Sequence, residues 1–357
     1  MTAFLDKKLA ALEPYTPGEQ PRDMDRLIKL NTNESPFSPS HRVIEVISAA
    51  EVEKLRLYSD PTCAALVRAI ADYNGVSPAQ VFPGNGSDEV LALLFHGFCE
   101  HGAIFPDITY GFYQVFAQMF GVPARQIPLR EDFSIAVEDY VNSKETVFLA
   151  NPNAPTGLAL SCQEIEKLLK QNKNRLVVVD EAYVEFGAET AVPLLKDYDN
   201  LIIVRTFSKS HALAGARLGY ALASEALIGA LNTLRYSFNP YNINRLSLLA
   251  GQAAMEDTDY FRACRKRIVD SRAYTIGALR AMGFAVPESR ANFLFAGGNP
   301  RLPGRIYFQK LRENGILVRH FDIPRIADYV RITIGTQAQM EQLVAVTEHL
   351  LTGEGRS

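Results

Sequence analysis

The residues best suited to chemistry lie in a polar loop between two apolar runs of the chain. Residues 201–204 lead into this loop, residues 218–222 follow it, and Ser208, Lys209 and Arg217 lie between them. A lysine held between two strands can form an imine with a carbonyl cofactor, and a serine with an arginine suits a phosphate group. Most loop lysines are solvated surface residues, so the significance of Lys209 depends on what the rest of the chain brings to it.

Other polar or aromatic residues also come directly after apolar segments. Asp180 and Tyr183 end one strand of the buried type, residues 151–157 follow another, and Tyr110 follows a third. An aromatic ring at such a place can stack on a flat ligand, although simple packing is the more common role. Because the crevice of a parallel sheet lies at the carboxyl ends of its strands, we expect these side chains to converge with Lys209.

Two further segments are weak signals when taken alone. Glycines precede Ser87 and Asp88 at the start of an apolar helical pattern, where free backbone N–H groups suit a phosphate. The proline-rich residues 14–39 predict an extended arm, in which Tyr15, Asn31, Asn33 and Glu34 could meet a ligand, although a tethered surface segment is the more common case. Together with the strand ends, these segments predict one site that combines an acid, a lysine, a phosphate cradle and aromatic rings.

The elements that must position these residues alternate between continuous apolar strands and amphipathic helices. This alternation predicts an α/β fold with a mainly parallel sheet covered on both faces. Helical patterns are expected over 41–55, 64–73, 112–120, 161–171, 226–236, 244–255 and 258–282. Short strands at 284–286, 293–295, 316–319 and 330–334 indicate a smaller α+β domain. We therefore expect a large domain over 41–250 and a small one formed by 1–40 and 251–357.

Composition limits the classes of partner and the compartment. The chain is 47% hydrophobic and 22% charged with a net charge of -3, so neither nucleic acid nor an anionic membrane is indicated. The four cysteines lack the spacing of a metal site or a disulfide framework, so no metal is expected. Charged residues appear too early for a signal-peptide core, and no apolar run approaches about 20 residues. A cytoplasmic protein is predicted.

The ordered set of motifs resembles the fold-type I pyridoxal-phosphate enzymes and, within them, the histidinol-phosphate aminotransferases. The matching segments are residues 15–18, 30–36, 84–89, 151–157, 180–186, 205–219, 315–319 and 330–335. The resemblance implies a large domain with a seven-stranded, mainly parallel sheet covered by helices, plus a smaller α+β domain. It also implies pyridoxal 5′-phosphate as the cofactor.

The resemblance assigns roles to the candidate residues. Lys209 would hold the cofactor covalently and then move a proton at the substrate Cα, while Asp180 would keep the pyridine nitrogen protonated. Tyr183 would hydrogen-bond the phenolic oxygen of the ring and Tyr110 would stack on its face. The cofactor phosphate would be held by the amides of Ser87 and Asp88, by Ser208 and Arg217, and by Tyr58 of a neighbouring subunit. The last contact implies a homodimer.

One position departs from the family pattern. The family has an asparagine directly before Pro-Thr-Gly that contacts the phenolic oxygen, but this chain has Ala154 there. Asn153 is adjacent, yet a shift of one residue in an extended loop generally points a side chain elsewhere. Asn153 is therefore a weak candidate for this contact.

The substrate question concerns the anion-binding residues. Arg331, with Arg319 and Tyr15, resembles the family's patch for both the phosphate of histidinol phosphate and the carboxylates of 2-oxoglutarate, and Asn33 is a further substrate candidate. The resemblance thus implies histidinol-phosphate:2-oxoglutarate transamination in histidine biosynthesis. Alternatives are an aromatic amino-acid aminotransferase, a threonine-phosphate decarboxylase, or a catalytically silent sensor or scaffold that binds pyridoxal phosphate.

Overall fold

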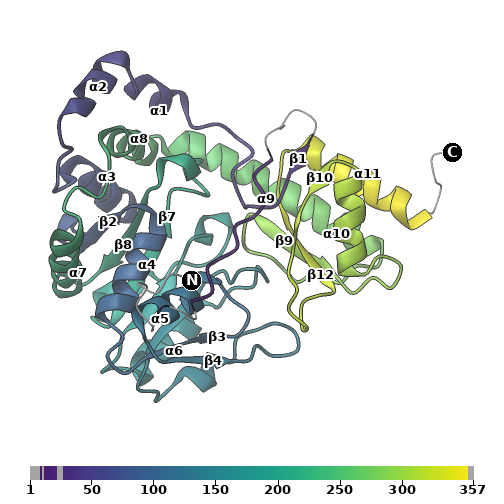
Figure 1. Ribbon diagram of the computed structural model, residues 1–357, viewed down its shortest axis with the longest axis horizontal. Coiled ribbons are helices and arrows are strands. Elements are labelled where there is room, and N and C mark those ends of the chain that lie inside the picture. The colour runs from purple at the N-terminus through teal and green to yellow at the C-terminus, as the bar shows by residue number, and fades with distance from the viewer. Residues whose placement is uncertain (1–8, 10–11, 22–26, 353–357) are drawn as a thin grey trace.

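The computed structural model describes residue 9 and residues 12–21 and 27–352 of the chain. Residues 1–8, on which the expectation about a signal peptide depends, lie outside the described residues. The centre of the fold is a seven-stranded sheet in the order β2-β8-β7-β6-β5-β3-β4, in which only β8 runs antiparallel to its neighbours. The predicted α/β class with a mainly parallel sheet is confirmed (Figure 1). The strands are β2 (Val81–Gly84), β3 (Ala103–Pro106), β4 (Ala124–Ile127), β5 (Thr146–Ala150), β6 (Val177–Asp180), β7 (Leu201–Thr206) and β8 (Gly219–Ala223).

Helices cover both faces of this sheet because the inner strands are apolar at successive positions. On β6, Val177 and Val179 belong to a buried cluster with α3, α6 and α8, whereas Val178 belongs to another with α4, α5 and α7. Such strands are typical of parallel sheets buried on both sides. The helices are α3 (Ala64–Asn74), α4 (Gly86–Gly97), α5 (Phe112–Phe120), α6 (Cys162–Gln171), α7 (Glu225–Phe238) and α8 (Arg245–Glu256). A capping box formed by Ser161 and Glu164 starts α6.

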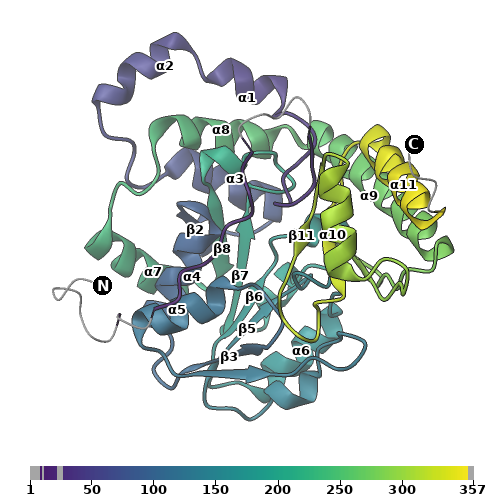
Figure 2. The same ribbon diagram turned by 45° about the vertical axis from the view of Figure 1, so that its right-hand side comes forward.

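A second, smaller sheet follows the long helix α9 (Thr258–Ala281), which runs from the large sheet towards the small one in Figures 1 and 2. The small sheet is antiparallel, in the order β11-β12-β9. Its buried side shares a third apolar cluster with α9, α10 and α11. The bounds are β9 (Phe293–Gly297), α10 (Gly304–Glu313), β11 (Arg319–His320), β12 (Tyr329–Thr333) and α11 (Gln337–Thr352).

The described residues of the N-terminal arm, 14–21 and 27–39, are extended, as predicted, and one short strand anchors them. β1 (Ile28–Lys29) pairs in parallel with β10 (Ile316–Leu317) beside the small sheet. Leu30 then buries its side chain in the apolar cluster of that part of the fold. This pairing brings the residues that follow, Asn31 to Glu34, to the place where the two parts of the fold meet.

The structure corrects three of the expected elements. The helix expected over 41–55 is two helices, α1 (His41–Val46) and α2 (Ala49–Glu53), because Ser48 caps the second by accepting a bond from the Glu51 amide. The strand expected over 316–319 serves two sheets, with β10 and β11 separated at Val318. The strand expected over 284–286 is a single bridge between Ala285 and Gly297.

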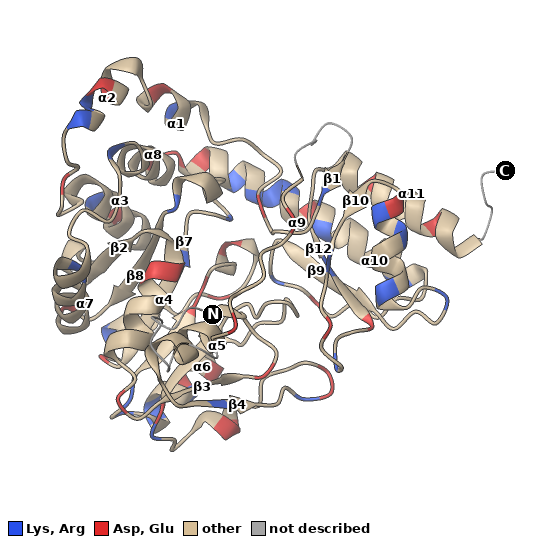
Figure 3. Ribbon diagram, in the orientation of Figure 1, with Lys and Arg blue, Asp and Glu red and all other residues tan. Residues whose placement is uncertain are grey.

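Acidic and basic residues are distributed over both parts of the fold (Figure 3). No helix in the described residues combines the length and the apolar character that crossing a membrane requires.

Candidate active site

Two adjoining cavities, of about 470 and 360 Å³, lie at the carboxyl ends of the central strands. Both are lined by Lys209, Tyr183 and Tyr110, and both are bordered on the arm side by Thr32. The first also contains Asp180, Ser87, Asp88, Ser208 and Arg217, and the second contains Tyr15, Asn33, Arg319 and Arg331. The structure therefore brings together all the predicted site residues except Tyr58 and Asn153.

Lys209 lies in the turn that connects β7 to β8. The turn is shaped by left-handed backbone at Ala212 and Arg217, and the Ser208 amide donates to Thr206 Oγ1 at 3.1 Å. The Lys209 ammonium donates to the carbonyl oxygen of Thr32 at 3.3 Å. Burial, and then the charge of Arg331, lower the pKa of Lys209 to about 8. A larger share of this amine is thus neutral near pH 7 than for an ordinary lysine, as a nucleophile or base requires.

Asp180 ends β6 and is buried. Its Oδ2 accepts from the Tyr113 hydroxyl at 3.1 Å and its Oδ1 from the Ala182 amide at 3.1 Å. Burial raises the pKa of Asp180 to about 7, and no Lys or Arg in the described residues forms an ion pair with it. A buried acid that faces a cavity and has no cationic partner of its own is suited to a ligand that brings a cationic N–H group.

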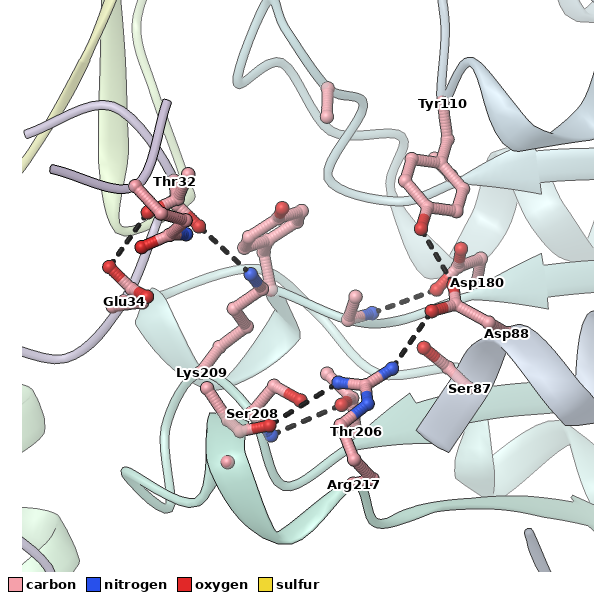
Figure 4. Close-up of a pocket in the computed structure, with 17 residues that line it drawn as sticks. Thr32, Glu34, Ser87, Asp88, Tyr110, Asp180, Thr206, Ser208, Lys209 and Arg217 are labelled. Atoms are coloured by element: carbon pink, nitrogen blue, oxygen red, sulfur yellow. Dashed lines mark hydrogen bonds and ion pairs between the residues drawn. The ribbon is translucent and has the colours of Figure 1, made fainter. Parts of the chain in front are cut away.

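The first turn of α4 and the turn before β8 form the phosphate end of the site. Gly86 has a φ of 77°, and a Cβ atom at Gly219 would meet the Ser87 nitrogen at 2.3 Å, so both positions require glycine. The amides of this first turn have no acceptor within the helix. Arg217 Nη2 lies 3.0 Å from Asp88 Oδ2, and the Tyr110 hydroxyl donates to Asp88 Oδ1 at 2.6 Å (Figure 4).

Tyr183 lies between the two cavities, and the arm supplies its partner. Asn33 Nδ2 donates to the Tyr183 hydroxyl oxygen at 3.0 Å, and burial raises the pKa of Tyr183. Ala154 borders both cavities, whereas the amide of Asn153 is used by its own loop and by the loop that follows β3. Asn153 donates to the Ile108 carbonyl and to Thr156, and it accepts from Thr109 at 2.8 Å. The structure thus does not bring Asn153 to the site.

The two arginines of the second cavity contact the arm. Arg319 Nη2 donates to the Thr16 carbonyl at 2.9 Å, and Arg331 Nη2 donates to the Asn31 carbonyl at 2.9 Å. Arg331 Nε is buried and has no hydrogen-bond partner in the described part of the chain. Tyr15 stacks on Phe112 with ring centroids 4.4 Å apart. Arg331 therefore retains a donor for an anion in this cavity.

Tyr58 lies outside both cavities. Its side chain is 80% exposed and stacks on Tyr241 with centroids 4.4 Å apart. The sequence marked Glu34 only as an arm residue that could meet a ligand, and it assigned no role to Thr32 or Tyr113, yet all three line the site or support it. Tyr113 follows Tyr110 by about one helical turn, and this spacing was the feature of the sequence that could have indicated its role.

The residues of the first cavity fit pyridoxal phosphate. Asp180 lacks a cation, Lys209 has a lowered pKa, and Ser87, Ser208 and Arg217 supply donors for a phosphate. The ring would lie in the space bordered by Tyr110 and Ala182. This fit agrees with the cofactor expected from the sequence.

Comparisons with known proteins identify the family to which this chain belongs. The model of the class I and II aminotransferases matches residues 25–346. Histidinol-phosphate aminotransferases of Pseudomonas putida and Acinetobacter baumannii are 46% and 47% identical to the chain over 96% of its length, which spans 99% and 95% of those proteins. The crystal structure of histidinol-phosphate aminotransferase from Sinorhizobium meliloti in complex with pyridoxal-5′-phosphate is 28% identical, with a TM-score of 0.81 over 92% of each chain. The chain thus belongs to the class I and II aminotransferases and, within them, to the histidinol-phosphate aminotransferase family.

Proposed function

We propose that this protein is a pyridoxal-phosphate-dependent aminotransferase that interconverts imidazole acetol phosphate plus glutamate with histidinol phosphate plus 2-oxoglutarate, in histidine biosynthesis. The observation that carries the proposal is the position of Lys209, which borders both the cavity with Asp180 and Arg217 and the cavity with Arg319 and Arg331. A reacting amine between a cofactor site and an anion site is what transamination of an anionic substrate requires. The names of the relatives support the same substrate.

The chain's own residues would bind and orient the cofactor, which when bound supplies an electron sink for the Cα carbanion. Asp180 would accept the hydrogen bond of the ring N–H. Tyr183, held by Asn33, would donate to the phenolic oxygen. Ser208, Arg217 and the amides of Ser87 and Asp88 would hold the phosphate, and Arg217 would share its charge between this phosphate and the Asp88 carboxylate.

Proton transfer falls to Lys209. With a pKa near 8, the amine can accept a proton from the substrate Cα and return one near neutral pH. Arg319 and Arg331 present planar donors that suit a phosphate in one half-reaction and a carboxylate in the other. In each case the anion would replace arm carbonyls that these arginines now contact.

We further propose a cytoplasmic homodimer in which Tyr58 reaches the phosphate of the neighbouring subunit. Support comes from the exposure of Tyr58 and of the nearby apolar side chains Ile44, Ile47, Leu55 and Leu57, which form an uncovered face on the segment from α1 to Tyr58. We also retain the proposed division at residues 40/41 and 250/251. The separate apolar clusters under the two sheets support two parts. The boundary at 250/251, however, falls inside α8, whose Ala253 and Met255 still pack in the cluster under the large sheet.

Turnover by the purified protein tests the function. Histidinol phosphate, phenylalanine and threonine phosphate are each supplied with and without 2-oxoglutarate, and glutamate and carbon dioxide are measured. We expect glutamate from histidinol phosphate, and none after Lys209→Ala. Glutamate chiefly from phenylalanine would indicate an aromatic aminotransferase, and carbon dioxide from threonine phosphate would indicate a decarboxylase. Cofactor binding without turnover of any of the three would indicate a silent sensor.

A further inference from the structure

The carboxylates that line the two cavities differ in how many of their oxygens are engaged. Asp88 accepts from Tyr110 and Arg217, and Asp180 accepts from Tyr113 and Ala182. Asp107, at the edge of the second cavity, accepts from the Leu129 amide and from Arg325. In each of these three residues both oxygens have a partner.

Glu34 is the exception. Its Oε2 accepts from Lys29 and from the Thr32 hydroxyl, whereas its Oε1 has no hydrogen-bond partner among the described residues. The Lys29 side chain is only 8% exposed, so the ion pair fixes the Glu34 carboxylate from the protein side. The Glu34 side chain itself is 40% exposed and lines the cavity with Lys209 (Figure 4). One oxygen is thus anchored and the other is available to a ligand.

Glu34 is also ionised at neutral pH. Although burial alone would raise its pKa, hydrogen bonds from Lys29 and Thr32 and the charges of Lys29 and Lys209 hold the pKa below its ordinary value. An anchored carboxylate with a free oxygen accepts a hydrogen bond from N–H groups and disfavours anions.

The functional groups of the proposed substrate can now be matched to the site. The phosphate is matched by Arg319 and Arg331, and the amino group would meet the cofactor beside Lys209. The imidazole remains, and it is the part of histidinol phosphate that offers an N–H to an acceptor. We propose that Glu34 is a specificity-determining residue whose Oε1 accepts a hydrogen bond from the imidazole N–H of histidinol phosphate. This inference rests on the proposed function and adds to it the group that recognises the ring.

The same arrangement distinguishes the two substrates that share the site. 2-Oxoglutarate has no ring and carries two carboxylates, so it gains nothing from Glu34 and is repelled by its charge. Removing the carboxylate should therefore weaken the reaction of histidinol phosphate without weakening that of 2-oxoglutarate. A residue needed only to hold the arm would affect both reactions in the same direction.

A matched pair of substrates tests the inference. The kcat/KM of the cofactor-loaded enzyme is measured with histidinol phosphate and with phenylalaninol phosphate, whose ring lacks an N–H. Loss of a charge-assisted hydrogen bond predicts that Glu34→Ala lowers the ratio of the two values by roughly ten- to hundredfold. Glu34→Gln, which keeps a neutral acceptor oxygen, should have a smaller effect. The KM for 2-oxoglutarate should stay the same or fall.

Glu19→Gln is the control variant. Glu19 lies on the same arm and pairs with Arg312, but it lines neither cavity, so the ratio should not change. If Glu34→Ala lowers kcat/KM for both phosphorylated substrates by the same factor, the residue only supports the arm and the inference is overturned.

Binding is measured separately in a Lys209→Ala background, where the reaction cannot proceed. Titration calorimetry with histidinol phosphate should show weaker binding when Glu34→Ala is added, by a factor similar to that in kcat/KM. Binding that is equal with and without the Glu34 carboxylate would overturn the inference even if the wild-type enzyme turns over histidinol phosphate normally. Absence of any binding of histidinol phosphate to the wild-type protein would overturn the proposed function as well.

Discussion

Replacing Asp180 by asparagine should stabilise the cofactor-free protein at high pH, although it removes a residue needed for activity. The unfolded chain has an ordinary aspartate with a pKa near 3.8, whereas burial raises the pKa of Asp180 in the folded protein to about 7. A raised folded-state pKa means that stability is fully present below about pH 4 and is lost as the pH rises through 7. At 1.36 kcal/mol per pKa unit, the charge costs at most about 4 kcal/mol of unfolding free energy above pH 7.

Asparagine fits the same position, but the hydroxyl hydrogen of buried Tyr113 then loses its only acceptor among the described residues, which costs the variant about 1–3 kcal/mol at every pH. Its Oδ1 can accept from the Ala182 amide, and its Nδ2 can donate to the Tyr113 oxygen, which now donates to Asp180. The stability of Asp180→Asn relative to the wild type should therefore rise by about 2–3 kcal/mol between pH 5 and pH 8, which turns a penalty at low pH into an advantage at high pH. The catalytic cost should be on the order of 10²-fold or more, because the variant can no longer stabilise a cationic ring nitrogen.

Urea unfolding followed by far-UV circular dichroism measures this difference, since the chain contains no tryptophan to report on unfolding. The cofactor-free wild-type protein and variant are compared at equal concentration at pH 5, 6, 7 and 8. Glu145→Gln is the control. A hydrogen bond from Arg125 lowers the pKa of Glu145 to about 2, so the loss in this variant should stay constant over the same pH range. A stability difference between Asp180→Asn and the wild type that stays the same from pH 5 to pH 8 would refute the argument from burial.

Three further predictions concern the same site. In the cofactor-free protein, the rate of trace acetylation of Lys209 should reach half its maximum near pH 8. The midpoint for Lys170 should lie at a much higher pH, because its hydrogen bond to Glu166 raises its pKa. Equal pH profiles for the two lysines would show that burial does not lower the pKa of Lys209. Arg331→Lys should weaken the half-reactions of histidinol phosphate and 2-oxoglutarate by comparable factors of about ten or more, because the planar fork is lost; a loss confined to one half-reaction would show that the two anions do not share this site. Ala154→Asn should shift the pH at which the visible absorbance of the cofactor-loaded protein changes, since it adds a donor beside Tyr183; an unmoved midpoint would contradict the proposed effect of Ala154.

Much of the fold could be predicted because strong local signals agreed with the global arrangement. The buried strands β5 and β6 are continuous apolar runs, and their helices begin at recognisable caps such as Ser161. The polar edge strand β4 was not predicted because its residues are mostly exposed and carry no apolar pattern. The break at Ser48 was missed because the apolar spacing continues across it.

The site was predictable at strand ends and less so elsewhere. Lys209, Asp180 and Tyr183 each follow a strand directly, so topology alone brings them together. The contribution of the arm depends on the pairing of β1 with β10, a contact between residues almost 300 positions apart that no local pattern specifies. For this reason Asn33 was expected at the substrate, whereas its side chain also supports Tyr183, and Glu34 was expected only as an arm residue that could meet a ligand.

The contacts between the arm and the site have a consequence for sequence variation. Arg319, Arg331 and Lys209 all donate to main-chain carbonyls of the arm, those of Thr16, Asn31 and Thr32. Every amino acid carries such a carbonyl, so the arm can change most of its side chains and still present the same acceptors. Shortening the arm by one or two residues would instead displace all the acceptors that follow. Length is therefore a property of this segment that natural selection is expected to preserve, together with the identity of the few side chains, Asn33 and Glu34, that act in the site.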